Sequence, residues 1–116
     1  MARPIVISAS TVIGDSVVNA QGDDLGKVEE VMLDVEDERI AYAVVSFGGF
    51  LGIGDKLFAV PWGALQLDAQ EHRFVLDESR ERLEKAPGFD KKNWPDFADR
   101  TIGKEIYGYY GIEQYW

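Results

Sequence analysis

Hydrophobic and charged residues alternate over residues 27–36, where Val31, Leu33 and Val35 are separated by a methionine and an aspartate. Alternation with a period of two is typical of a strand with one buried face. The next segment, residues 39–47, is apolar on both faces of a strand. An antiparallel strand that is buried on both sides needs cover from outside its own sheet. We therefore expect a further segment of the chain to pack on it.

Short apolar stretches at close spacing predict the remaining strands. We expect strands at residues 16–19, 56–62, 65–67 and 73–76, separated by glycine-rich or acidic turns. This spacing favours a small antiparallel β-barrel over a doubly wound parallel sheet. Ser79 is placed to cap a short helix that runs to Lys85, before Pro87 and Gly88 end it. The sequence therefore predicts a mainly β domain with a short helix over residues 1–87.

Residues 88–116 differ in character, because they hold two of the three tryptophans and four of the five tyrosines. Ile102, Ile106 and the tyrosines that follow recur at three- and four-residue spacings, which predicts a helix over residues 99–110. Glycines within that stretch weaken it, so the helix needs packing in order to form. We predict a partly helical aromatic C-terminal extension that packs on the barrel or on a second subunit.

Composition narrows the classes of function. The chain has 116 residues, a net charge of -9 and no cysteine. The excess of acid argues against binding to a nucleic-acid backbone or to anionic lipid. The lack of cysteine excludes disulfides and cysteine nucleophiles. No apolar stretch reaches the length of a membrane span, and residues 5–7 are too short for the core of a signal peptide. We expect a cytoplasmic protein that neither binds nucleic acid nor inserts into a membrane.

Few side chains are placed for chemistry. The glycines at positions 49, 52 and 54 lead into a strand rather than a helix, so they do not fit a dinucleotide-binding loop. Nine carboxylates between residues 15 and 38 offer oxygen ligands, but they lack the spacing of a calcium-binding loop. His72, the only histidine, lies in a polar turn without a serine or aspartate at a catalytic spacing. The sequence therefore predicts no catalytic residue, no cofactor and no metal site.

Three segments resemble the PRC-barrel domain family, which is named after the cytoplasmic domain of the photosynthetic reaction-centre H subunit. They are GKVEEVMLD at 26–34, RIAYAVVSFGG at 39–49 and GDKLFAVPW at 54–62, the last followed by Ala64 and Leu65. The third segment is the most specific, and the resemblance covers about residues 8–80. The family also includes the C-terminal domain of a ribosome maturation factor. The resemblance implies a compact barrel that acts as a protein-interaction module, here in a small stand-alone bacterial form, and it carries over no catalytic residue.

The predicted function is a non-catalytic protein-interaction or scaffolding module that forms a homodimer and binds a protein partner. Alternative functions are a small-molecule or divalent-metal binding module and a ribosome-assembly accessory protein. Aromatic and apolar residues outside the barrel pattern are the predicted contacts, because such side chains favour interface hot spots. The contact residues are Phe50, Leu51 and Ile53, which could instead fold back to plug one barrel end, and Tyr107, Tyr109, Tyr110, Tyr115 and Trp116 of the extension.

Overall fold

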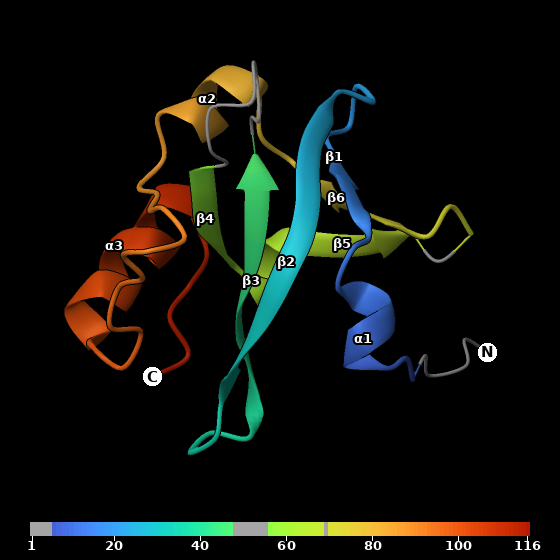
Figure 1. Ribbon diagram of the computed structural model, residues 1–116. Coiled ribbons are helices and arrows are strands. Elements are labelled where there is room, and N and C mark those ends of the chain that lie inside the picture. Colours follow the sequence, from blue (N-terminus) through green and yellow to red (C-terminus); the bar gives the residue numbers. More distant parts are fainter. Residues whose placement is uncertain (1–5, 48–55, 69) are drawn as a thin grey trace.

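The computed structural model describes residues 6–47, 56–68 and 70–116, and its main feature is one curled sheet with helices around it (Figure 1). The six strands of the sheet lie in the order β4-β3-β2-β1-β6-β5. The strands are β1 (Ser16–Val18), β2 (Asp24–Asp34), β3 (Arg39–Phe47), β4 (Lys56–Pro61), β5 (Leu65–Asp68) and β6 (Arg73–Leu76). The helices are α1 (Ala9–Val12), the 3-10 turn η2 (Trp62–Ala64), α2 (Arg80–Glu84) and α3 (Arg100–Tyr110).

The sheet is mixed, because β1 and β6 pair in parallel while the other neighbours are antiparallel. The turn η2 redirects the chain after β4, and the β5–β6 hairpin then reaches β1 on the far side of the sheet. Within the described ranges β4 and β5 are the two edges and no ladder joins them, so the sheet is curled and open. The predicted mainly β fold with short helices and an aromatic C-terminal region is confirmed. The parallel pair is an addition that local sequence patterns do not predict.

Both faces of β3 are buried, as its apolar sequence requires. Five consecutive residues, Ala41 to Val45, are at most 9% exposed. Successive side chains of a strand point to opposite faces, so each face has its own cover. On one face the extension covers β3, because the ring centroids of Phe97 and Tyr107 lie 5.3 and 5.6 Å from that of Tyr42. Figure 1 shows α3 beside β4 at this margin of the sheet.

Local capping residues set the boundaries of α2 and α3. The Ser79 hydroxyl and the Asp99 carboxylate each accept a backbone N–H, at 3.1 and 2.9 Å. Gly111, with φ 68°, ends α3 in the left-handed conformation that glycine favours. Both predicted helices are confirmed. The sequence does not predict α1, because its four residues are too few to carry a periodic pattern.

The hairpin of β2 and β3 extends beyond the rest of the sheet (Figure 1). β1 pairs with β2 only as far as Lys27, and Val28 makes the last backbone bonds on that side, to Gly14 and Asp15. The hairpin continues to Asp34, with Glu29 and Ala41 as extra residues in the ladder between its strands. Bulges of this kind bend a strand and increase its twist. In the described part of the chain, residues 29–34 therefore have a strand on one side only.

Candidate interaction surface

The contact residues predicted from the sequence fall into two groups. Phe50, Leu51 and Ile53 lie outside the described residues. The aromatic residues of the extension pack against the core of their own chain: Tyr107 and Tyr110 are buried, and Tyr109, Tyr115 and Trp116 are half-buried. Their role as contacts for a partner stays a prediction. In the structure they help to attach the extension to the sheet and to α2, through three anchors.

The first anchor joins Tyr107 to the bulge in β3. Ala41 is the extra residue of that bulge and pairs with neither neighbouring strand. Its carbonyl accepts a hydrogen bond of 2.8 Å from the hydroxyl of Tyr107, which is 3% exposed. Burial raises the pKa of Tyr107, and likewise that of Tyr42, to about 12. The extension thus satisfies a backbone group that the sheet leaves unpaired.

The second anchor is centred on Asp34 at the end of β2. Its carboxylate accepts hydrogen bonds from the Tyr115 hydroxyl at 2.5 Å and from the Arg100 guanidinium at 3.2 Å. The backbone N–H of Asp37 is a further donor at 3.1 Å. These bonds, that from Tyr115 most, lower the pKa of Asp34 from 3.8 to about 2. The guanidinium of Arg39 lies 3.7 Å above the Tyr115 ring. One face of the hairpin end is therefore fixed to the last residues of the chain.

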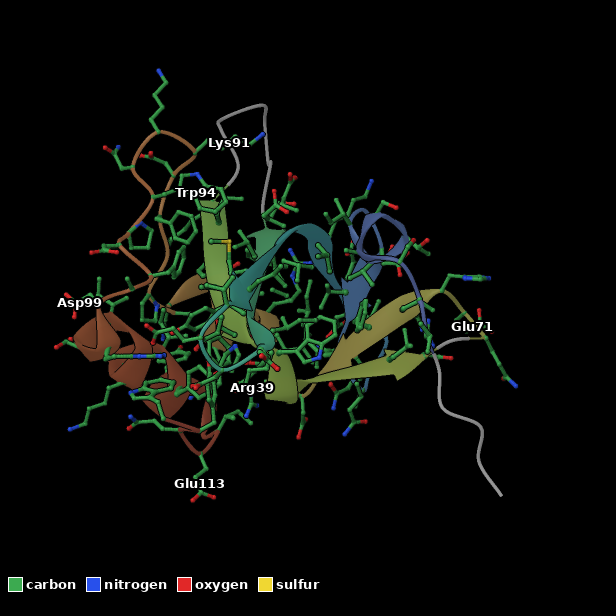
Figure 2. The ribbon with its side chains drawn as sticks, turned by 90° about the horizontal axis from the view of Figure 1, so that it is seen from below. Arg39, Glu71, Lys91, Trp94, Asp99 and Glu113 are labelled. Atoms are coloured by element: carbon green, nitrogen blue, oxygen red, sulfur yellow. The ribbon has the colours of Figure 1, made fainter. Side chains whose placement is uncertain are left out.

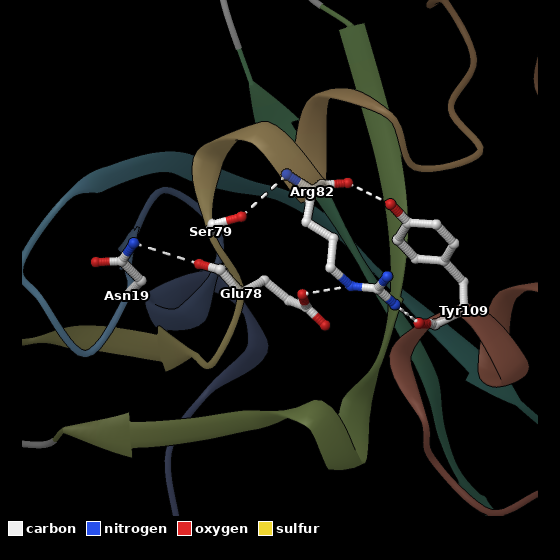
Figure 3. Close-up of polar contacts among 5 residues, drawn as sticks. All are labelled: Asn19, Glu78, Ser79, Arg82 and Tyr109. Atoms are coloured by element: carbon white, nitrogen blue, oxygen red, sulfur yellow. Dashed lines mark hydrogen bonds and ion pairs between the residues drawn. The ribbon is translucent and has the colours of Figure 1, made fainter.

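The third anchor joins α2 to α3 through Arg82 and Tyr109 (Figure 3). The Arg82 guanidinium donates to the backbone carbonyl of Tyr109, and the Tyr109 hydroxyl donates to the carbonyl of Arg82. Arg82 also pairs with Glu78 at 2.8 Å. On the other side of α2, the Asn19 amide donates to the Glu78 carbonyl at 3.3 Å. This chain of contacts connects the start of the sheet to the extension.

The extension also covers part of the edge strand β4. The backbone N–H and carbonyl of Leu57 exchange hydrogen bonds of 2.8 Å with Phe89. The Phe89 ring lies 5.1 Å from the ring of Trp94 and 5.8 Å from that of Phe97. An edge strand presents unpaired backbone groups to solvent, and a covering segment reduces that exposure. β4 is thus partly closed, in contrast to the end of β2.

Beyond the anchors, the end of the hairpin exposes apolar side chains. Leu33 is 67% exposed and Val35 is 81% exposed. Two grooves of about 400 and 390 Å³ lie here, and both are lined by Leu33 and Val35. The first extends to Phe97 of the extension and the second to Glu38 in the turn. Exposed apolar side chains beside concave surface are typical of interaction sites.

The sequence does not point to this surface. Alternation over residues 27–36 predicts that Val31, Leu33 and Val35 share a buried face, and for the last two that expectation is wrong. The hairpin runs past the end of β1, and at its far end Leu33 and Val35 are exposed. The signal that could have found the site is length, because β1 spans three residues and β2 spans eleven.

The described side chains were compared with what a metal site or a proton-transfer site requires. No group of three or more histidine, cysteine, aspartate or glutamate residues within them could hold a metal ion. His72 is exposed at φ 53° in the β5–β6 turn. The surroundings lower the pKa of Asp34 and raise the pKa of Arg100 and of tyrosines such as Tyr110, in each case further from neutral pH. A general acid or base needs a pKa near the working pH, so none of these groups is tuned for proton transfer near neutral pH.

Comparison with models of protein families gives a match. The family model of the PRC-barrel domain matches residues 4–83, from the N-terminal segment to α2. No curated protein matches the chain. None of the helices in the described ranges is long and apolar enough to cross a membrane.

Proposed function

The chain belongs to the PRC-barrel family, and from this premise we propose that it is a non-catalytic protein-interaction module that binds through the end of its β2–β3 hairpin. One observation carries the proposal: Leu33 near the end of β2 and Val35 in the turn that follows are both exposed, on a hairpin that the extension holds in place. We name the exposed end of the hairpin, residues 29–38, the hairpin surface.

Attachment of the opposite face supports this role. Asp34 and Arg39 contact Tyr115, so the hairpin surface is held from behind by the extension. A surface that is already ordered loses less conformational entropy on binding, which increases affinity for a given contact area. The proposal that the module is non-catalytic rests on membership of the PRC-barrel family, from which no catalytic residue carries over to this sequence.

Affinity capture with matched variants tests the proposal. The tagged full-length chain is compared with a double variant, Leu33→Asp with Val35→Asp, and with Leu67→Asp as control. Leu67 is also exposed, at 36%, but it lies on β5. Proteins from the source cells that the wild type and the control retain, and the double variant loses, are then purified. We expect such a protein to bind the wild type directly in calorimetry and to bind the double variant at least about tenfold more weakly.

Equal capture by all three proteins would contradict the proposal. Thermal unfolding of each variant separates loss of contact from loss of fold, because side chains this exposed contribute little to stability. The predicted homodimer and the predicted contacts of residues 50–53 and of the extension remain separate proposals. Sedimentation of the purified chain over a range of concentrations tests the homodimer.

A further inference from the structure

We propose that the free edge of β2, from Glu29 to Asp34, binds an extended segment of a partner protein as an added strand, and that basic and apolar side chains alternate in this segment. The inference rests on the proposed interaction function and specifies the chemistry of the partner.

No described segment of the chain pairs with the backbone of β2 at this edge. The last bonds to the segment before β1 are made at Val28. The Val31 N–H donates a hydrogen bond of 3.2 Å to the exposed carboxylate of its neighbour Glu30. This bond takes the place of the bond that a neighbouring strand would accept from Val31. Six residues are enough for a strand of ordinary length. Unpaired N–H and carbonyl groups along an edge form a template for strand addition.

The two faces of β2 present different side chains to an added strand. Val31 pairs with Ala43 and Leu33 pairs with Ile40, and residues directly opposite each other share a face. This face is apolar; it is half-buried at Val31 and exposed at Leu33. Glu30 pairs with Val44 and Met32 pairs with Tyr42, on the face that carries the extension. An added strand therefore meets Val31 and Leu33 on one face, and on the other the exposed Glu30 beside the half-buried Met32.

The charges decide between two occupants of the edge. Three ion pairs occur among the described residues, and none involves Glu30, Glu36 or Glu38. Asp34 is already paired with Arg100. A second copy of this chain would bring the same glutamates against each other, and like charges across a strand pair are destabilising. Basic side chains in the partner would instead meet glutamates that form no ion pair with any described residue. The edge therefore fits a basic partner rather than a second copy of this chain.

A competing explanation is that the acidic, bulged edge exists to prevent pairing, since charged edges suppress aggregation. Three capped octapeptides separate the two explanations. One alternates lysine and valine, the second has the same composition as a lysine block followed by a valine block, and the third alternates glutamate and valine. Each is titrated into the isotope-labelled full-length chain, and amide signals are followed by NMR.

We expect the alternating lysine peptide to bind saturably, to shift the amide signals of Val31 and Leu33, and to slow hydrogen exchange at Val31 at least about tenfold. The block peptide and the glutamate peptide should bind at least about tenfold more weakly, because they lack either the alternation or the charge. Absence of saturable shifts at the edge would overturn the proposal. So would equal affinity for the block peptide, because that result indicates charge attraction alone.

Matched charge reversals provide the second test. Glu30→Lys should weaken the alternating lysine peptide about three- to tenfold and strengthen the glutamate peptide. Glu71→Lys makes the same change of net charge in the β5–β6 turn, and Figure 2 shows Glu71 on the opposite side of the molecule from Asp99 and the extension. The control should leave affinity within about twofold. Equal losses in both variants would overturn the proposal.

The two proposals fail in different ways. If the peptides do not bind but capture of a partner still depends on Leu33, strand addition is wrong and the interaction module stands. If capture is unaffected by the hairpin variants as well, both proposals are wrong.

Discussion

Two glycines in α3 should respond in opposite ways to replacement by alanine. Gly108 has no heavy atom within 4 Å of the position where a Cβ would stand, and its backbone is helical. Alanine is favoured over glycine within a helix by about 0.5–1 kcal/mol, so Gly108→Ala should stabilise the protein by that amount. A Cβ at Gly103 would lie 2.7 Å from the Tyr42 hydroxyl and 3.0 Å from the Trp116 ring.

The same helical gain applies to Gly103→Ala, but here it competes with overpacking. Inserting a methyl group into a filled site costs about 1–3 kcal/mol. The net effect should be a destabilisation of about 1 kcal/mol, which places the two variants about 2 kcal/mol apart. For a chain of this length that difference corresponds to about 5–10 °C in Tm.

Urea and thermal unfolding followed by far-ultraviolet circular dichroism measure both values. Circular dichroism is preferred over fluorescence because Trp116 itself contacts the substituted site. If Gly103→Ala is as stable as Gly108→Ala, the ring of Trp116 moves aside without cost, and our account of how the extension packs on β3 is wrong. If Gly108→Ala is destabilising, α3 does not extend through that position.

Two further predictions concern the anchors. Tyr107→Phe removes the donor to the buried Ala41 carbonyl and should cost about 1–3 kcal/mol in urea unfolding, whereas an unchanged midpoint would mean that the bulge is satisfied in another way. Asp34→Asn should destabilise the protein at pH 7 but not at pH 2. The folded pKa of about 2 lies below the ordinary 3.8, so the carboxylate stabilises the fold above about pH 4 and loses this effect as pH falls towards 2. Thermal unfolding between pH 2 and 7 checks this, and a difference in Tm that does not vary with pH would contradict it.

The parts of the fold that local chemistry specifies could be predicted from the sequence. Ser79 and Asp99 cap helices through bonds to residues two or three positions away, so their signal is contained in a short window. The β2 and β3 strands carry their patterns in consecutive residues. The parallel pairing of β1 with β6 has no such signal, because Val17 and Phe74 come together only after the curl of the sheet is formed.

The candidate site was harder to predict, for two physical reasons. Asp34 looks like one of many acids in the sequence, and its partners Arg100 and Tyr115 lie 66 and 81 positions away. Leu33 has the pattern of a core residue, but it lies where the hairpin has run past the end of β1, and it is exposed. The sequence shows that the aromatic extension lies outside the pattern of barrel strands, but composition alone does not distinguish side chains that cover their own sheet from those that contact a partner.

The anchors also determine how the hairpin surface can be studied. Tyr107 satisfies the bulge at Ala41, and Phe97 and Tyr107 cover Tyr42, so ending the chain at Pro87 would expose a buried strand face and leave a buried carbonyl unpaired. Loss of binding in such a truncation would follow from damage to β3 even if the extension never contacts a partner. Leu33 and Glu30 are both exposed and take part in none of the three anchors, so substitutions there leave the anchors in place. For this reason they, and not removal of the extension, separate the binding role of the hairpin from its structural support.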